Sequence, residues 1–589
     1  MKNSNTHSFY SFLFVALFAT VNISYSQSPL SGDNIKTLIE KYKNDIRGPY
    51  KDIRWFCTDG SVRQPKDPCP DNIGPGVQHA RYKDEVVALG KSNHIFLGQI
   101  LAFSTNDDLW DIDHNHSRLK QYQLDKYLRL IDDGWVNQKG QFYRGSVQVE
   151  DEEAWGIGFY KWILAKDALV ADNFYFLRQS LKDIPHNGDD NVAQLMRSES
   201  KVISDIYTPF MDLRTKIHSL PEKSDIQKVI DFKAKNQKSL TTDLIKKIDG
   251  LVVTMQTFFK PVDVQSLLNK SKLVKGTTLG DKVQAFVQGK ASNDSPSYLV
   301  NETAQLLLDI REGLLEEKRP MARLQLLDIS LKLEELLFQN APNWEPTTVS
   351  GQLEKICALT TASVGAGYLE LWEWEQISGT LSKFGQDQLS LAELTQVLET
   401  ARAAVEWSAA MVKANYQEVV DTYTTFEPKS YAFIDDRIRG SVALHLGKSV
   451  GELGDFIAKE SALTNLVMDI PNQSTFRGLN PGYAFGELVV VDGSSEDIEV
   501  SSDKIYIFQR SPSDLKPIAG IATVAEGNMV SHVQLLARNL GIPNAALSDA
   551  NLQSLKKYDG ERVFYAVSNK GNVIIKPESK MTDQERGLF

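Results

Sequence analysis

The stretch that decides the fold of the C-terminal part of this 589-residue chain is Gly527-Asn528-Met529-Val530-Ser531-His532-Val533-Gln534-Leu535-Leu536-Ala537-Arg538-Asn539-Leu540-Gly541-Ile542-Pro543. It predicts a strand, a glycine-bearing turn and then a helix with Ser531 as its N-cap, a position that serine favours. Gly541 and Pro543 end this helix, because glycine accepts the left-handed conformation and proline cannot continue a helix. A strand, a turn and a helix in this order indicate an α/β domain.

The same stretch places a histidine where a phosphoryl group could be held. With Ser531 as the N-cap, His532 lies in the first helical turn, where free backbone N–H groups and the positive end of the helix dipole collect. This environment disfavours the protonated imidazole, so a neutral nitrogen is available as a nucleophile. Once phosphorylated, the side chain would bring negative charge to a helix end that favours it.

The flanking sequence supports a compact domain. The composition changes near Pro471, and short β-rich runs follow. Strands are predicted over 485–491, 504–509, 521–525, 562–567 and 572–575, the last two joined by a hairpin turn. Together with the helix after Ser531, they predict a C-terminal α/β domain of about a hundred residues.

The stretch resembles the phosphohistidine, or swivelling, domain of the PEP-utilising enzyme family, which includes PEP synthase, pyruvate phosphate dikinase and the glucan water dikinases. In that family a Thr-Ser-His-Ala-type turn opens a helix that runs to Ala-Arg-x-Leu-Gly-Ile-Pro, and the histidine carries phosphate between two distant sites. The residues that match are Ser531, His532, Ala537, Arg538, Leu540, Gly541, Ile542 and Pro543, and Gly482, 486–490 and 511–512 resemble upstream parts of the domain. The resemblance covers residues 475–577 and implies that His532 is the phosphoryl carrier.

Several positions depart from the family pattern. Asn528 replaces a second small residue, Val530 replaces Thr or Ser, and Val533 and Gln534 replace small residues after the histidine. An apolar-Ser-His-Val order is similar to the water dikinase branch. Arg538 lies six positions after the histidine, about 120° around the helix. It is therefore predicted to act in docking or packing and not as a direct phosphate ligand.

Helical patterns dominate residues 30–470, as in 225–259, 303–315, 321–338, 352–371, 389–423 and 442–469. The predicted fold is a mostly α N-terminal region followed by the C-terminal α/β swivelling phosphohistidine domain. The predicted boundaries are a signal peptide over 1–26, an N-terminal region over 27–150, a helical domain over 151–470, the phosphohistidine domain over 475–577 and a tail or truncated linker over 578–589.

The N-terminus and the charge of the chain indicate its compartment and exclude one partner. Residues 1–27 combine Lys2, an apolar run over 9–23 and the small residues Ser24 and Ser26, the pattern of an export signal. No later stretch is long and apolar enough to span a membrane. We therefore predict a periplasmic or extracellular protein. The chain has 65 Lys and Arg against 76 Asp and Glu, a net charge of −11, which disfavours nucleic acid as a partner.

The three cysteines fit an exported protein. Cys57 and Cys69 flank a polar segment that contains proline and glycine, which predicts a disulfide across a short surface loop. A zinc site is the alternative, although two further nearby ligands are missing. Cys357 lies in a helical apolar pattern and is predicted to be a buried free thiol.

Other polar clusters are weaker candidates for sites. The segment 111–116 holds two aspartates and two histidines, and His114, His116 and Asp113 are its candidate metal ligands. It reads equally well as a polar loop before a helix, and no metal site is assigned. Arg178 and Arg197 suggest an anion-binding patch or, as the favoured reading, surface pairing with neighbouring acids. The run 435–439 predicts local ion pairs along a helix.

The sequence thus predicts phosphoryl transfer through a phosphohistidine, resembling PEP synthase and pyruvate phosphate dikinase. It contains no phosphate-binding loop and no recognisable ATP-grasp domain, so we expect one part of a split or truncated dikinase. On its own the chain is expected to bind no cofactor. Mg²⁺ and ATP would come with an ATP-grasp partner, and the phosphoryl acceptor stays open. The alternative is a non-catalytic exported helical binding protein that retains the swivel domain for interaction.

Overall fold

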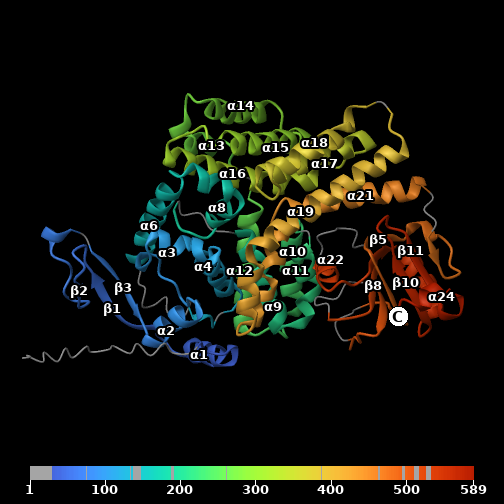
Figure 1. The fold of residues 1–589 in the computed structure, drawn as a ribbon, viewed down its shortest axis with the longest axis horizontal. Helices are drawn as coiled ribbons and strands as arrows, with labels where there is room; N and C mark the ends of the chain where they lie inside the picture. Colours follow the sequence, from blue (N-terminus) through green and yellow to red (C-terminus); the bar gives the residue numbers. More distant parts are fainter. Residues whose placement is uncertain are drawn as a thin grey trace, which may run out of the picture.

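The structure is a computed structural model that describes residues 29–74, 76–132, 134–136, 147–186, 192–219, 221–260, 262–386, 388–461, 465–493, 498–509, 516–524 and 532–589. A helical body carries a small sheet at one end and a C-terminal α/β domain at the other (Figure 1). The predicted fold class, a helical region followed by an α/β domain, is therefore confirmed. The predicted signal peptide lies outside the described residues. None of the described helices is long and apolar enough to cross a membrane.

One hydrophobic core holds the helical body together. Among the described residues it runs from Ile35 to Ile457, and Leu535 of the C-terminal domain joins it. The helices are α1 (Gly32–Asn44), α2 (Asp84–Asn93), α3 (Asn106–Trp110), α4 (Ser117–Ile131), α6 (Val147–Ile163), α7 (Asp167–Asp172), α8 (Phe174–Ser180), α9 (Val192–Ile206), α10 (Met211–Ser219), α11 (Asp225–Asn236), α12 (Thr242–Phe258), α13 (Ser266–Lys270), α14 (Thr278–Ser292), α15 (Pro296–Gly313), α16 (Pro320–Asn340), α17 (Val349–Gly365), α18 (Leu371–Leu381), α19 (Leu391–Thr424), α20 (Phe433–Arg439) and α21 (Ala443–Ser461).

The helices follow the predicted apolar patterns closely. The pattern over 321–338 becomes α16, which begins at Pro320, and the pattern over 389–423 becomes α19. Ser390 caps α19 by accepting a hydrogen bond from the N–H of Glu393, whose side chain bonds back to Ser390. The single helical pattern over 225–259 is divided into α11 and α12, because Thr241 begins a new helix as its N-cap.

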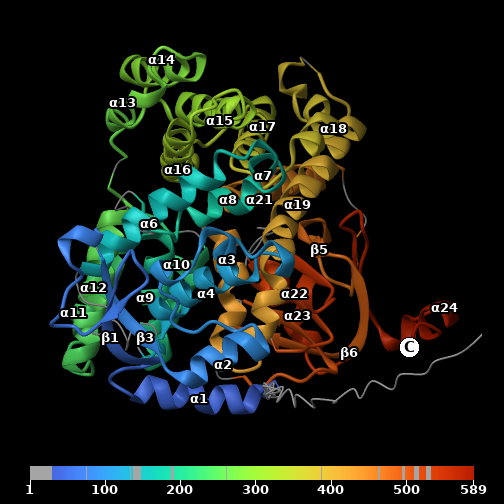
Figure 2. The same ribbon diagram turned by 60° about the vertical axis from the view of Figure 1, so that its left-hand side comes forward.

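A three-stranded antiparallel sheet near the N-terminus was not predicted, since residues 30–470 were expected to be helical. It has the order β2 (Val62–Arg63), β1 (Tyr50–Phe56), β3 (Val77–Tyr82). Residues of β1 after Tyr50 are half-buried or exposed on both faces, so the strand lacks the alternation of buried and exposed residues that reveals a strand. Figure 2 shows this sheet beside the helical body.

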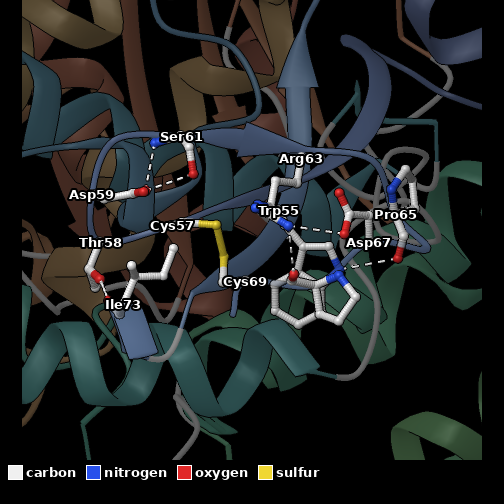
Figure 3. The surroundings of a disulfide bond; sticks show 11 residues. Trp55, Cys57, Thr58, Asp59, Ser61, Arg63, Pro65, Asp67, Cys69 and Ile73 are labelled. Carbon is white, nitrogen blue, oxygen red and sulfur yellow. Dashed lines mark hydrogen bonds and ion pairs between the residues drawn. A yellow bond between two sulfur atoms is a disulfide. The ribbon is translucent and has the colours of Figure 1, made fainter. Parts of the chain in front are cut away.

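The predicted disulfide between Cys57 and Cys69 is present, with the two Cα atoms 5.6 Å apart (Figure 3). It joins the end of β1 to the loop after β2. Trp55 donates from Nε1 to the carbonyl oxygen of Pro65 at 3.1 Å, and Arg63 pairs with Asp67 at 3.0 Å. A side chain at Gly76 would overlap Cys69 Sγ, so the bridge packs against bare backbone. Cys357 is free, as predicted, although it is only partly buried.

The C-terminal domain contains an eight-stranded sheet with the order β4-β11-β10-β6-β7-β8-β9-β5. Strands β6, β7, β8 and β9 run parallel to one another. Strand β10 pairs antiparallel with both β6 and β11, and β5 pairs antiparallel with β9. The strands are β4 (Leu466–Val467), β5 (Arg477–Asn480), β6 (Gly482–Val491), β7 (Lys504–Phe508), β8 (Gly520–Val524), β9 (Asn544–Leu547), β10 (Arg562–Val567) and β11 (Val573–Pro577). The five predicted strands are all present, and β4, β5 and β9 were missed.

Helices cover both faces of this sheet. Alternate residues of β7 point to opposite faces, with Ile505 and Ile507 on one face and Tyr506 and Phe508 on the other. Helix α22 (His532–Asn539) packs on the Tyr506 face, and α23 (Asp549–Leu555) packs on the Ile505 face. The domain therefore has three layers.

Residues 578–589, predicted as a tail or truncated linker, contain the short helix α24 (Asp583–Arg586). Phe589 lies against the sheet, with its ring centroid 5.6 Å from that of Tyr483 and 5.6 Å from that of Phe485. Lys576 on β11 pairs with Glu585 at 2.7 Å. These contacts place the last residues of the chain on the sheet at β6 and β11.

Two predictions about charged residues were wrong. Arg178 and Arg197 were expected to pair at the surface, yet both are fully buried. Arg178 Nη1 binds Glu334 at 2.7 Å, and Arg197 Nη2 donates to the carbonyl oxygen of Arg439 at 2.8 Å. The run 435–439 forms α20, but it is buried and bonds across the fold: Arg437 pairs with Asp183 at 2.5 Å, and Asp436 accepts from Tyr127 at 2.7 Å. Burial requires these charges to be satisfied, and the partners are far away in sequence.

Candidate functional site

The predicted carrier histidine begins the helix of a strand–helix–strand unit. Helix α22 connects β8 to β9, which lie side by side and parallel, with Ile521 opposite Asn544. His532 is the first residue of α22. The side chain of His532 and all of Ser531 lie outside the described parts of the structure. The chain order therefore places His532 at the amino end of a helix that follows the carboxyl end of a parallel strand.

Buried polar and apolar contacts fix α22 on the sheet. Val533 and Ala537 pack with the apolar residues of the Tyr506 face. Gln534 is fully buried, donates to the carbonyl oxygen of Leu479 at 3.1 Å and accepts from Asn544 at 2.7 Å. Gln534, which departs from the small residue of the family pattern, thus ties the helix to β5 and β9.

The carboxyl end of α22 is the one predicted from Gly541. Gly541 has φ +67°, the left-handed conformation that glycine tolerates. The N–H of Ile542 donates to the carbonyl oxygen of Ala537 at 2.7 Å, and the N–H of Gly541 donates to that of Arg538 at 3.1 Å. This pair of bonds is a Schellman motif, which closes the helix before β9 begins.

The outer face of α22 contacts the helical body, on the side of the domain that faces α19 (Figure 1). Leu535 is buried in the core of the helical body and not in that of its own domain. Arg538 Nη2 lies 3.4 Å from Glu406 Oε1, and Lys413 Nζ donates to Asn539 at 3.0 Å. Burial lowers the pKa of Arg538, and the charge of Glu406 opposes this shift. Arg538 therefore lies at a contact between domains, in keeping with its predicted docking or packing role.

A second polar contact joins the same two parts of the chain. Arg477 on β5 donates to the carbonyl oxygen of Gly451 at 2.5 Å and pairs with Asp455 at 3.1 Å, both on α21. Burial disfavours the charged form of both side chains, so it lowers the pKa of Arg477 and raises the pKa of Asp455. Among the described residues, the apolar side chain of Leu535, ion pairs and hydrogen bonds thus join the domain to the body.

The candidate metal ligands of the segment 111–116 are separated by the structure. His114 Nδ1 lies 2.8 Å from Asp111 Oδ1, whereas the His116 ring packs on Trp110 and contacts the carbonyl oxygen of that residue at 2.7 Å. Asp113 is exposed at a pocket. His94, which sequence reasoning missed, joins the group, since its Nε2 lies 2.7 Å from Asp111 Oδ2. His94 is 17 residues before Asp111, and no local pattern links them.

Comparison of the chain with models of protein families, with curated proteins and with solved structures finds no match.

Proposed function

We propose that this chain is an exported phosphoryl carrier in which His532 accepts and passes on a phosphoryl group. The observation that carries the proposal is the position of His532 as the first residue of α22, the helix that connects the parallel strands β8 and β9. At this position the free N–H groups of the first helical turn favour added negative charge. The matching residues from Ser531 to Pro543 support the same assignment by resemblance to the PEP-utilising enzymes.

The proposed chemistry has two steps. A neutral ring nitrogen of His532 attacks the phosphorus of the donor, so that a P–N bond forms while the P–O bond to the leaving group breaks. In the second step an acceptor oxygen attacks the same phosphorus, and the P–N bond breaks. The donor is ATP with Mg²⁺ held by an ATP-grasp partner, and the acceptor is left open.

The contact between α22 and α19 supports a domain that moves. A carrier must reach two sites, so the docked position has to be reversible. Apart from Leu535 of α22 and the buried Arg477 of β5, the contacts between the described residues of the domain and the body include partly exposed pairs such as Arg538 with Glu406. Exposed pairs of this kind contribute about 0–1 kcal/mol each, which suits a contact that opens and closes.

The test uses the full mature chain, a nucleotide-binding ATP-grasp chain from the same genome, Mg²⁺ and ³²P-labelled ATP. We expect acid-labile, base-stable label on this chain and its loss in His532→Gln. The matched control, His116→Gln, changes another histidine and should keep the label. Label that survives His532→Gln would disprove the carrier assignment. No label, with a partner shown to phosphorylate its own histidine domain, would favour the alternative of an exported binding protein.

A further inference from the structure

A second candidate centre lies in the helical body, apart from the residues of α22. His94 Nε2 lies 2.7 Å from Asp111 Oδ2, and His114 Nδ1 lies 2.8 Å from Asp111 Oδ1. The two imidazole rings are stacked, with their centroids 3.9 Å apart. One possible ligand atom from each of the three residues lies within 4.8 Å of the others. Two ring nitrogens and one carboxylate therefore lie close enough together to share an ion.

These separations are close to those of a zinc site. Zinc binds imidazole nitrogen at about 2.0–2.1 Å in a tetrahedron, so neighbouring ligand atoms lie about 3.3 Å apart. The nitrogen–oxygen distances of 2.7 and 2.8 Å are hydrogen-bond distances. The side chains would have to move apart for an ion to replace these hydrogen bonds. His114 is exposed and His94 is half-buried, so neither is locked in a packed core.

The backbone holds two of the three residues, His94 and Asp111, in the left-handed conformation. His94 follows the last residue of α2 with φ +53°, and Asp111 follows the last residue of α3 with φ +49°. Left-handed backbone at non-glycine residues costs about 1–2 kcal/mol each. Gln121 fixes the His94 loop by donating to the carbonyl oxygen of His94 at 2.8 Å and accepting from the N–H of Phe96 at 2.9 Å. The N–H of Arg118 donates to Asp111 Oδ2 at 2.9 Å.

The two histidines face a cavity of about 420 Å³ between the 93–121 segment and α19. Its lining includes the carboxylates of Asp113 and Glu418 together with the hydroxyl-bearing residues Ser117, Thr422 and Tyr423. No lysine or arginine is among the residues that line this cavity in the described part of the chain. An acidic, polar cavity attracts a cation, and it leaves space for water or a small polar ligand beside the ion.

From this geometry we infer that His94, Asp111 and His114 form a binding site for a divalent transition-metal ion of the zinc type. Imidazole ligands favour Zn²⁺, Co²⁺, Ni²⁺ or Cu²⁺, whereas Mg²⁺ and Ca²⁺ prefer sites made only of oxygen. Three protein ligands leave a fourth coordination position for water or a polar ligand. The inference does not depend on His532, and it goes beyond the proposed phosphoryl transfer.

The test is a Co²⁺ titration of the full mature chain, prepared without a polyhistidine tag and treated with a chelator. We expect the visible absorption of tetrahedral Co²⁺ to saturate at one ion per chain, to vanish on addition of Zn²⁺ and to persist in excess Mg²⁺ or Ca²⁺. His114→Gln should weaken binding at least about 100-fold, since even outer-shell changes cost 10–100-fold. His114 is exposed, so this substitution is not expected to unfold the chain.

The matched control is Asp113→Asn, which removes an exposed carboxylate from the same cavity. It should change the affinity less than about fivefold. His94→Gln gives an independent check of the second imidazole, and circular dichroism shows whether each variant is folded. The inference is overturned if the unaltered chain shows no saturable binding. It is also overturned if folded His114→Gln and His94→Gln bind the ion as tightly as the unaltered chain.

Discussion

Replacing both Cys57 and Cys69 with alanine should loosen the outer half of the β1–β3 sheet and leave the helical body unchanged. The inner half of the sheet is anchored by the small cluster of Tyr50, Ala80 and Ile100. The outer half has no such cluster among the described residues, and Phe56 stacks on His79 there. The disulfide adds the covalent constraint on the outer strands.

The magnitude follows from the length of the loop that the disulfide closes. Cys57 and Cys69 are separated by 12 positions. In the chain-entropy model a loop of this length restricts the unfolded segment by about 9.5 cal/mol/K, or about 2.8 kcal/mol at 25 °C. Since about 1.4 kcal/mol is a factor of ten, the opening equilibrium of the outer sheet should shift about 100-fold.

Native-state hydrogen exchange measures this shift directly. The amide of Cys57, which donates to the carbonyl oxygen of Ser61, and the paired amides near Phe56 and Val62 should lose about 100-fold protection. Amides of α16 should keep theirs, and Cys357→Ala should change neither group. Unchanged protection around Cys57, or an equal loss throughout α16, would refute the reasoning that the bridge stabilises this sheet locally.

Three further predictions concern the core and the domain contact. Burial lowers the pKa of His445 to about 3, so between pH 6.5 and 3 the unfolded state binds one more proton than the folded state, and the free energy of unfolding falls as the pH falls. His445→Leu should therefore remove about 2 kcal/mol of the stability that is lost between pH 6.5 and 5, as measured by urea titration. An unchanged pH profile would contradict this. Asp183→Asn leaves the buried Arg437 guanidinium without its carboxylate and should cost about 3 kcal/mol in thermal unfolding, whereas a cost under about 1 kcal/mol would show that the pair is unimportant. Leu535→Asp should release the α/β domain from α19 and increase amide exchange in α22 and α19. Arg538→Ala should increase this exchange only slightly, because its partner Glu406 is exposed. Equal effects of the two substitutions would mean that the ion pair dominates the contact.

Local sequence patterns were sufficient for elements whose signal comes from neighbouring residues. Helix α22 could be bounded because Gly541 accepts the left-handed φ that its end requires. Strands β7 and β8 were found because they are apolar runs buried inside the parallel part of the sheet, and β6 because its buried and half-buried residues alternate. The disulfide was found because a short polar loop keeps two cysteines close. None of these features needs information from distant parts of the chain.

The sequence by itself therefore determined the helical region, the α/β domain and the position of His532 at the start of α22. Only the tertiary structure decided which partners the charges take and which residues meet. Arg437 binds Asp183, 254 positions away, because burial requires a carboxylate that the fold and not the helix supplies. His94 meets Asp111 and His114 because α2 and α3 are each followed by a residue with left-handed backbone that is not glycine. The residue types at these positions do not predict this conformation. The short strands β4, β5 and β9 exist because neighbouring strands offer their backbone hydrogen bonds, a cause that lies outside their own few residues.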